Sequence, residues 1–301
     1  MASGVIFEEI TCKTIINKTN TPGLGFRWSI NPYRGCQHAC VYCFARNTHE
    51  YLGYDAGRDF ESRIVVKINA AEILRQELSR AGWRGELIVL GTACDPYQQA
   101  EMKYEITRQM LRVFIEFAQP VHMLTKSTSV LRDLDLWSRL AQATDAQIAF
   151  SVPTLDEAVW KKMEPGTSKP SKRLEALGEL VQAGVPCGVM IAPIIPGLTD
   201  DDAHLEAVVR GARDHGASFV SPNVLNLKPG TKERFMPVLR EAYPHLEGRY
   251  QRYYRGPYAP QDYTQQVIER VNELRAKYGM DRAHPASERR GSPRGQLQMA
   301  L

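Results

Sequence analysis

The chain alternates between short, nearly continuous apolar runs and longer segments in which apolar residues recur with helical spacing. Five of the apolar runs have the length of a strand, at residues 86–92, 121–127, 146–153, 187–195 and 218–225. Runs of this kind are typical of strands that are covered on both faces, as in a parallel sheet. With FRWSINPY (26–33) as a first strand, the pattern predicts six strands.

Helical periods lie between these strands. The residues that share a helical face are Ile106, Met110, Val113, Phe114 and Phe117, then Leu174, Leu177 and Val181, then Leu205, Val208, Val209 and Ala212. Gly184 and Gly216 follow the last turns of two of these segments, where a residue in the left-handed conformation commonly ends a helix. The spacing therefore predicts strands and helices in alternation.

Such an alternating series implies a parallel sheet with right-handed crossovers. Six strand–helix units are too few to close like an eight-fold barrel, so we expect an α/β fold with an open, partial (β/α)6 barrel. Its functional residues should lie at the C-terminal ends of the strands. A doubly wound sheet is the competing topology.

The chain divides into three predicted parts. Residues 1–235 form the barrel with an N-terminal extension, residues 236–285 form an aromatic loop and a helix that pack on the barrel, and residues 286–301 form a flexible basic tail. The tail is predicted from its content of Pro, Gly, Ser and Arg.

Composition narrows the class of protein. The 43% hydrophobic and 24% charged content is typical of a soluble globular protein. No run of eighteen apolar residues is present and the N-terminus lacks an apolar signal core, so we expect a cytoplasmic protein with no membrane partner. The net charge of +4 permits a nucleic-acid partner without requiring one.

Three of the six cysteines, Cys36, Cys40 and Cys43, form the pattern C-x3-C-x2-C directly after the first predicted strand. A cytoplasmic chain of this size is not expected to hold a disulfide framework, so the cluster indicates metal binding. Soft thiolates select iron–sulfur clusters, zinc or copper(I). A cubane cluster takes four ligands, so three cysteines leave one iron open. A structural zinc site with His38 as fourth ligand is the alternative.

The string GCQHACVYCFAR around these cysteines resembles the motif of radical S-adenosylmethionine (radical SAM) enzymes. It is similar, more narrowly, to the spore photoproduct lyase-like branch, with a His between the first two cysteines and an aromatic-Ala-Arg after the third. TACDPYQQAE (92–101) also resembles a segment of that branch. The resemblance covers roughly residues 12–280.

The resemblance implies a radical SAM barrel and a [4Fe–4S] cluster held by Cys36, Cys40 and Cys43, whose open iron chelates SAM. It also implies reductive cleavage of SAM to a 5′-deoxyadenosyl radical that abstracts hydrogen from a substrate, with an electron donor such as flavodoxin or ferredoxin. The substrate is not identified. Nucleic acid, as in lyase-like DNA repair, is one candidate, and YQRYYRGPY (250–258) has the aromatic and basic content of a strand-stacking surface or of a loop packed on the core.

The resemblance places further residues around SAM. Tyr42 is expected beside the adenine, or as simple packing, and Gly91 and Thr92 are expected beside the amino group, although a glycine at a strand end is also ordinary in a turn. Lys126 and Ser151, at the ends of the third and fourth strands, are expected to contact the carboxylate and ribose. A lysine inside an apolar strand needs an anion to offset its desolvation, and a salt bridge to Asp95 is the alternative partner.

Five other positions carry expectations of the same kind. Arg173 is expected to reach the SAM carboxylate or to be an exposed arginine at the start of a helix, and Pro193 is expected to shape the backbone near the adenine. Asp95 and Glu101 are expected to orient SAM or substrate, because hydrogen abstraction by a radical needs no general base. Cys94 is expected to be a hydrogen donor to the product radical, as the resemblance implies, or a small core cysteine.

Two other classes of protein stay open at this point. A non-catalytic iron–sulfur redox or electron-transfer protein would supply four protein ligands and would not bind SAM. A zinc-stabilised binding module would be colourless.

Overall fold

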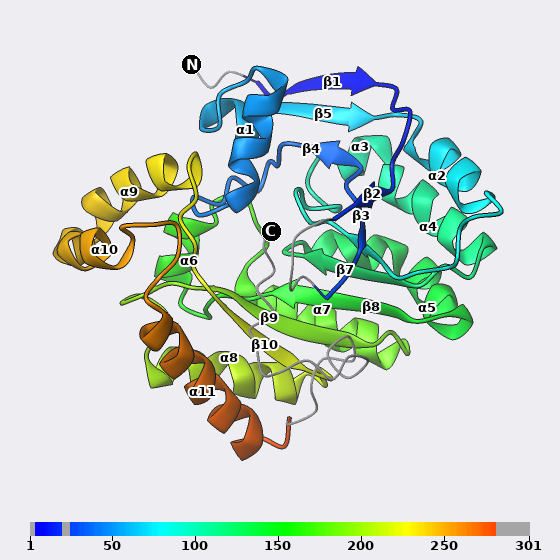
Figure 1. The fold of residues 1–301 in the computed structure, drawn as a ribbon. Helices are drawn as coiled ribbons and strands as arrows, with labels where there is room; N and C mark the ends of the chain where they lie inside the picture. Colours follow the sequence, from blue (N-terminus) through cyan, green and yellow to red (C-terminus); the bar gives the residue numbers. More distant parts are fainter. Residues whose placement is uncertain (1–3, 20–24, 281–301) are drawn as a thin grey trace.

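A seven-stranded sheet forms the centre of the computed structural model, which describes residues 4–19 and 25–280 (Figure 1). Its strand order is β10-β9-β8-β7-β6-β3-β2. The strands are β2 (Asn17–Lys18), β3 (Trp28–Ile30), β6 (Ile88–Leu90), β7 (Val121–Thr125), β8 (Ala146–Ser151), β9 (Cys187–Ile194) and β10 (Val220–Val224). All neighbours from β3 to β10 are parallel, and β2 adds an antiparallel edge. The six predicted strands are thus confirmed.

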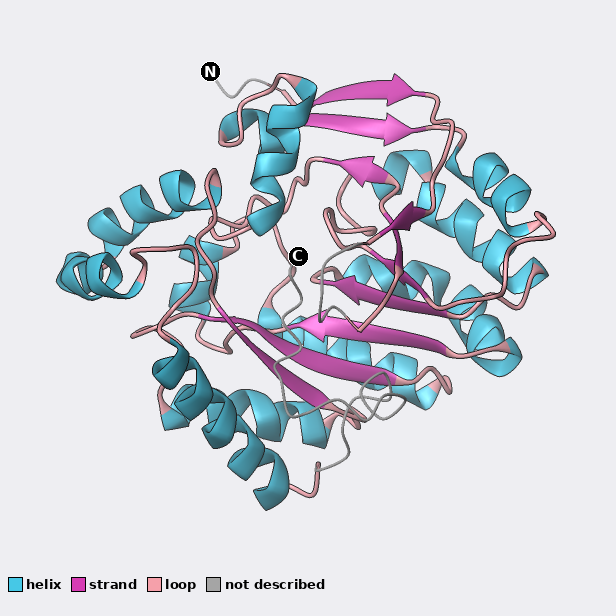
Figure 2. Cartoon of the chain, viewed as in Figure 1, coloured by secondary structure: helices cyan, strands magenta, loops and turns pink. Residues whose placement is uncertain are grey.

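The order of the parallel strands decides between the two predicted topologies. Each parallel strand lies beside the next one in the chain, from β3 through β10, without a reversal. A doubly wound sheet reverses its order at a switch point, whereas a barrel adds strands in one direction. The fold is therefore a partial (β/α)6 barrel, in which all six strands end on the same side (Figure 2).

Helices cover the outer side of this sheet (Figure 1). They are α2 (Ala70–Leu78), α4 (Ile106–Glu116), α5 (Leu134–Ala143), α7 (Pro170–Gln182) and α8 (Asp202–Asp214). The connecting segments contain the shorter helices α3 (Glu101–Tyr104) and α6 (Glu157–Met163) and the 3-10 helices η1 (Phe44–Leu52) and η2 (Thr128–Asp133). Gly184 and Gly216 have φ values of 81° and 82°, as predicted for residues that end helices. The apolar faces of α4, α7 and α8 are buried in the main core, so the predicted helical faces are confirmed.

A second, three-stranded sheet lies above the barrel and was not predicted. Its order is β1-β5-β4, with β1 (Ile6–Ile10) parallel and β4 (Tyr33–Arg34) antiparallel to β5 (Arg63–Lys67), and the short helix α1 (Arg58–Ser62) leads into it. Ile64, Val65 and Val66 of β5 are buried. This run of three β-branched residues is the signal from which the strand could have been predicted. The sheet matters for the site because β4 leads into the cysteine-rich segment.

The segment from residue 236 is helical where an aromatic loop was predicted. It contains α9 (Thr231–Ala242), η3 (Pro244–Leu246), α10 (Glu247–Tyr253) and then the predicted terminal helix, α11 (Gln261–Lys277). Tyr250 stacks between Phe235 and Tyr254, and both tyrosines are 1% exposed. The period of these buried rings, 250 and 254, is that of a helix face. The predicted basic tail, 286–301, lies outside the described residues.

The hydrophobic core fills the space between sheet and helices. Trp137, Phe114 and Phe150 are fully buried in it. None of the helices in residues 4–19 and 25–280 combines the length and hydropathy that a membrane span requires.

Candidate active site

The three clustered cysteines lie in a loop, residues 35–43, between β4 and η1. All are free, and they are buried or nearly so. Gly35 begins the loop with a φ of 78°, and a Cβ there would lie 2.9 Å from the carbonyl oxygens of Phe60 and Arg63. The Cys36 N–H donates to the Phe60 carbonyl at 2.8 Å. The loop therefore approaches α1 and β5 so closely that only glycine fits at its start.

Arg46, the arginine of the aromatic-Ala-Arg motif, donates hydrogen bonds to the backbone of the cysteine loop. It is fully buried, and its Nε and Nη2 donate to the Cys40 carbonyl at 3.2 and 2.8 Å. Nη1 donates to the Gly57 carbonyl at 2.9 Å, and Nη2 pairs with Glu61 at 2.5 Å. A buried guanidinium with every donor engaged fixes the backbone that presents the thiols.

The cysteines face two adjoining cavities at the C-terminal ends of the strands. The two cavities contain about 480 and 570 Å³ of empty space, part of which is open to solvent. Cys36, Cys40 and Cys43 line the first, and Cys40 and Cys43 also line the second. Lys126 and Ser151 line both. Gly91, Thr92, Cys94 and Asp95 line the first, and Tyr42 and Pro193 line the second.

Arg173, which was predicted to reach the SAM carboxylate, lines neither cavity. It is fully buried, so the alternative of an exposed helix-start arginine is wrong. Its Nε donates to the Ser168 carbonyl at 2.8 Å, Nη1 donates to the Ser151 carbonyl at 2.7 Å, and Nη2 pairs with Glu164. With its guanidinium so engaged, Arg173 supports the strand ends from behind instead of facing the cavity.

Lys126 is paired with Glu164, not with Asp95. Its Nζ lies 3.5 Å from Glu164 Oε1, donates to Ser151 Oγ, and lies 3.3 Å from the Ala192 carbonyl. Only its backbone N–H reaches Asp95, at 2.7 Å. The ammonium group is thus held at the cavity wall by the ends of β8 and β9.

Glu164 was not singled out from the sequence, yet it is central to the site. It is 2% exposed and accepts hydrogen bonds from the Tyr42 hydroxyl and from Arg173. Burial alone would raise the pKa of this carboxyl, but the charges of Arg173 and Lys126 and the hydrogen bonds from Arg173 and Tyr42 hold the pKa below its usual value. The sequence signal was an acid followed by the turn PGTS, which is unremarkable without the contacts.

Asp95 is committed to neighbouring protein groups. It accepts hydrogen bonds from the Tyr97 N–H at 2.9 Å and Thr125 Oγ1 at 2.8 Å, and it pairs with His38 Nδ1 at 3.3 Å. Burial opposes its ionisation, but His38 and the backbone donors bring the net pKa of Asp95 below its usual value. The carboxylate therefore ties the cysteine loop to the end of β7.

Glu101 lies away from the cavities. It is fully buried and bonds the Tyr33 hydroxyl, the Thr107 N–H and Arg132. The expectation that it orients SAM or substrate is not supported by this position, because neither cavity includes it. It has the contacts of a structural residue instead.

Asn31 is a second residue that sequence reasoning missed. Its Nδ2 donates to Thr92 Oγ1 at 2.9 Å, and its Oδ1 accepts from the Ala93 N–H at 2.7 Å. Cys94 Sγ lies 3.8 Å from the same oxygen. Asn31, which follows β3, thus fixes the segment after β6 that lines the first cavity.

The donor set fits an iron–sulfur cluster better than a single ion. Among the described residues, no group of three or more His, Cys, Asp or Glu side chains converges as the ligands of one metal ion do. His38, the fourth ligand in the zinc alternative, directs Nδ1 to Asp95. Three separate thiols around one cavity suit a cluster that takes one thiolate for each of three irons.

A sequence profile of the radical SAM superfamily matches residues 30–208. The uncharacterized protein Rv2578c of Mycobacterium tuberculosis is 41% identical over 283 residues, which make up 93% of this chain and 83% of that protein. The uncharacterized protein MJ0683 of Methanocaldococcus jannaschii is 30% identical over 244 residues, 81% of this chain and 86% of that protein. These relatives show the family without showing a reaction.

Two further matches carry descriptive names. A radical SAM Nalpha-GlyT isomerase of Pseudomonas phage M6 is 25% identical over 182 residues, which are 58% of this chain and 35% of that protein. Spore photoproduct lyase, in a structure with bound AdoMet and dinucleoside spore photoproduct, superposes with a TM-score of 0.69 at 16% identity, covering 92% of this chain and 80% of that one. At this identity the likeness shows the fold. The chain belongs to the radical SAM superfamily, and it is an enzyme with the fold of spore photoproduct lyase.

Proposed function

We propose that the protein binds a [4Fe–4S] cluster through Cys36, Cys40 and Cys43 and uses SAM to abstract hydrogen from its substrate. When bound and reduced, the cluster supplies the electron that cleaves SAM to methionine and a 5′-deoxyadenosyl radical. The observation that carries the proposal is the single cavity wall formed by the three thiols and Lys126. The protein's own contribution is to hold, orient and enclose the reactants.

Lys126 is proposed to bind the carboxylate of SAM. At the cavity edge, the buried carboxylate of Glu164 is shared by two cations, the buried Arg173 and the partly buried Lys126. Arg173 makes the closer ion pair with Glu164, so these three groups carry one more positive than negative charge. A carboxylate that enters the cavity beside Lys126 would balance this charge in a region partly shielded from water.

The other cavity residues are proposed to complete the SAM site. Ser151 Oγ donates to the Ala192 carbonyl at 2.6 Å, which places this hydroxyl at the wall shared by both cavities. Gly91 has a φ of 87°, and a Cβ there would lie 2.6 Å from Pro96 Cδ. Thr92, Tyr42 and Pro193 surround the remaining cavity surface, consistent with contacts to the amino group and adenine.

Cys94 is proposed as the hydrogen donor to the product radical. Its thiol is 6% exposed and lines the cavity that holds the three ligand cysteines. Burial raises the pKa of Cys94 to about 12, so the sulfur keeps its hydrogen at neutral pH. A neutral S–H is the form that a hydrogen-atom donor requires.

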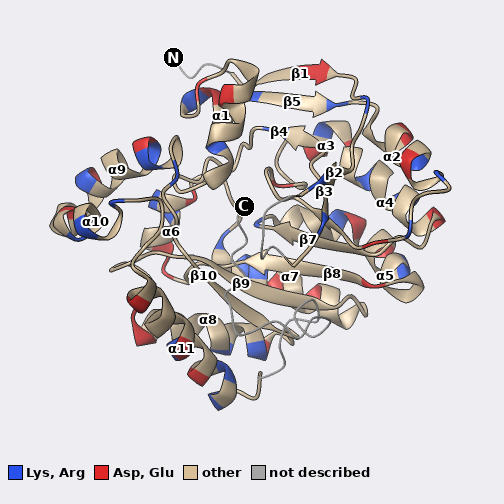
Figure 3. Ribbon diagram, in the orientation of Figure 1, with Lys and Arg blue, Asp and Glu red and all other residues tan. Residues whose placement is uncertain are grey.

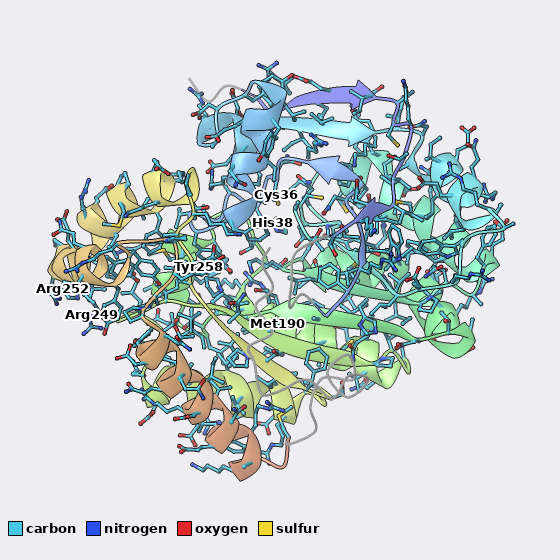
Figure 4. The ribbon with its side chains drawn as sticks, viewed as in Figure 1. Cys36, His38, Met190, Arg249, Arg252 and Tyr258 are labelled. Atoms are coloured by element: carbon cyan, nitrogen blue, oxygen red, sulfur yellow. The ribbon has the colours of Figure 1, made fainter. Side chains whose placement is uncertain are left out.

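A nucleic acid is the proposed substrate class. Arg249 and Arg252 of α10 and the exposed Arg255 that follows it form no ion pair with any residue in the described part of the chain. Figure 3 shows basic as well as acidic residues on α10. Tyr258 is 47% exposed and pairs with Asn226, which lines the second cavity. In Figure 4 Tyr258 lies between the two labelled arginines and Cys36. The segment that carries these arginines thus reaches the cavity rim at Tyr258, and the arginines are proposed to hold the phosphates of an anionic chain.

The comparisons support the same class. The neighbour of known structure holds a dinucleoside spore photoproduct, which is a ligand of the nucleic-acid class. The packed Tyr250 and Tyr254 are not available for base stacking, so the proposal depends on the arginines and Tyr258.

The proposed reaction is tested with protein reconstituted anaerobically with iron and sulfide, then reduced with dithionite in the presence of SAM. Formation of 5′-deoxyadenosine and methionine, measured by liquid chromatography, is the expected result. Reduced, iron-loaded protein that leaves SAM intact even with single-stranded DNA added would contradict it.

Replacing Cys94 by alanine separates its proposed role from that of a fourth ligand. We expect Cys94→Ala to retain the iron content of the wild type and to cleave SAM, because the three ligand thiols are untouched. With a substrate, turnover should stall after hydrogen abstraction. Loss of iron from this variant would instead make Cys94 a ligand and favour the four-ligand redox protein.

Replacing Arg249, Arg252 and Arg255 together by glutamine should weaken binding of a single-stranded oligonucleotide. If each contacts one phosphate, the slope of log affinity against log salt should fall by about 2, at roughly 0.7 per contact for a single strand. Fluorescence anisotropy at several salt concentrations measures this slope. The matched control is the exposed set Arg80, Arg84 and Arg112, changed in the same way, and an equal effect there would refute a specific surface.

A further inference from the structure

The cysteine loop packs against a segment far away in sequence, residues 163–167, which follows α6. We call it the clamp segment. The Val41 N–H donates to the Met163 carbonyl at 3.0 Å, and the Gly166 N–H donates to the His38 carbonyl at 3.0 Å. Gln99 Nε2 donates to the Gly166 carbonyl at 2.9 Å and holds the clamp segment from its other side. Figure 4 labels His38 and Cys36, which identify the loop.

Gly166 is required by this close approach. A Cβ at this position would lie 2.3 Å from the Gln37 carbonyl oxygen and 2.9 Å from that of His38, both backbone atoms of the cysteine loop. Real Cβ atoms essentially never come within 3.0 Å of another heavy atom, so any side chain here must displace the loop. The position leaves room for hydrogen alone.

Glu164 adds a side-chain contact to the backbone contacts. It accepts the hydrogen bond from the hydroxyl of Tyr42, the residue between Cys40 and Cys43. Its other oxygen is held by Arg173, which also bonds the end of β8 through the Ser151 carbonyl. The loop is thereby connected to the same strand ends that hold Lys126.

We propose that the clamp segment positions the cluster-binding loop: Gly166 and the Met163 carbonyl set its backbone, and Glu164 fixes Tyr42 between two ligand cysteines. These are positioning residues, since none of them is a ligand. The inference rests on the proposed function in that the loop is taken to hold the cluster. Beyond the proposed function, the inference is that a segment after the fourth barrel strand, β8, sets the backbone conformation in which the cysteine loop can bind the cluster.

The test compares Gly166→Ala with Gly178→Ala. Gly178 lies in the neighbouring helix α7, and a Cβ there would meet nothing closer than 3.6 Å, so it is a matched control. In the full chain before iron is added, alkylation by iodoacetamide is followed thiol by thiol with mass spectrometry. In the reconstituted chain, release of iron to a chelator is measured.

Gly166→Ala should speed alkylation of Cys36, Cys40 and Cys43 by about tenfold. Overpacking of a close contact destabilises it by about 1 to 3 kcal/mol, and about 1.4 kcal/mol raises the population of the displaced loop tenfold. Iron release should accelerate similarly. Cys12 and Cys187, which lie outside both cavities, should react as in the wild type. Gly178→Ala should match the wild type in every measurement.

A second variant, Tyr42→Phe, decides the matter if Gly166→Ala does not fold. It removes only the hydroxyl that bonds Glu164, and it should speed alkylation of the flanking Cys40 and Cys43 by about tenfold, as expected for a lost hydrogen bond to a charged group. Unchanged thiol reactivity in a folded variant would overturn the inference. A different result would refute the proposed function alone: the wild type takes up no iron, but the clamp variants still expose these thiols. In that case the positioning of the loop by the clamp segment would still be supported.

Discussion

Replacing any one of Cys36, Cys40 and Cys43 by alanine is expected to abolish stable cluster binding while leaving a folded chain. The three thiols line one cavity, and among the described residues only Cys94 offers another thiol at its wall. A cubane with two protein ligands would expose two irons to solvent and be lost. The barrel itself should persist, since its main core contains none of the three cysteines.

Iron and sulfide content, the brown absorbance after anaerobic reconstitution, and 5′-deoxyadenosine formation measure this effect. Cys12→Ala and Cys187→Ala serve as controls, because neither residue lines the cavities. Circular dichroism establishes that each variant is folded. Full iron content in any of the three ligand variants would refute the assignment of that cysteine.

Replacing Lys126 by alanine should weaken binding of S-adenosylhomocysteine by about 1 to 3 kcal/mol, roughly a 5- to 150-fold rise in Kd. The ammonium group lies at the wall of both cavities, and the close Glu164–Arg173 pair leaves its charge available to an anion. Without it, neither cavity keeps a lysine or an arginine among the described residues that line it. Isothermal titration calorimetry with reconstituted protein measures the change.

Methylthioadenosine, which lacks the amino-acid carboxylate, provides the discriminating comparison. Its affinity should change little in Lys126→Ala, because the contact that is removed is to the carboxylate. Lys161→Ala, on the exposed face of α6, is the matched lysine control. Equal losses for both ligands would mean that Lys126 supports the cavity instead of binding the carboxylate.

Much of the fold could be predicted because the barrel strands carry their signal locally. Strands buried on both faces must be apolar throughout, so runs such as 187–195 are visible without knowledge of their partners. The small sheet was not predicted because β4 has only two residues, and because β1 (IFEEI) is an exposed edge strand in which two adjacent glutamates interrupt the apolar residues. β1 pairs with β5 residues 57 positions away, and β4 pairs with β5 residues 31 to 33 positions away.

In the candidate site, too, the residues that could be predicted are those whose signal lies in neighbouring residues of the chain. The spacing of Cys36, Cys40 and Cys43 indicated a metal or cluster site by itself, because ligands in one short loop need no distant partner to be recognised. Glu164 could not be found in this way. A glutamate before a turn is ordinary until the fold brings Tyr42, Lys126 and Arg173 around it.

The sequence by itself determined the parallel strands and helices, the three thiols and the strand-end position of Lys126, since each of these is written in residues close together along the chain. Only the tertiary structure decided that Lys126 pairs with Glu164, that Arg173 turns away from the cavity and that the clamp segment holds the cysteine loop. The physical reason is burial: a charged group taken out of water must find partners wherever the fold supplies them, and those partners come from distant segments.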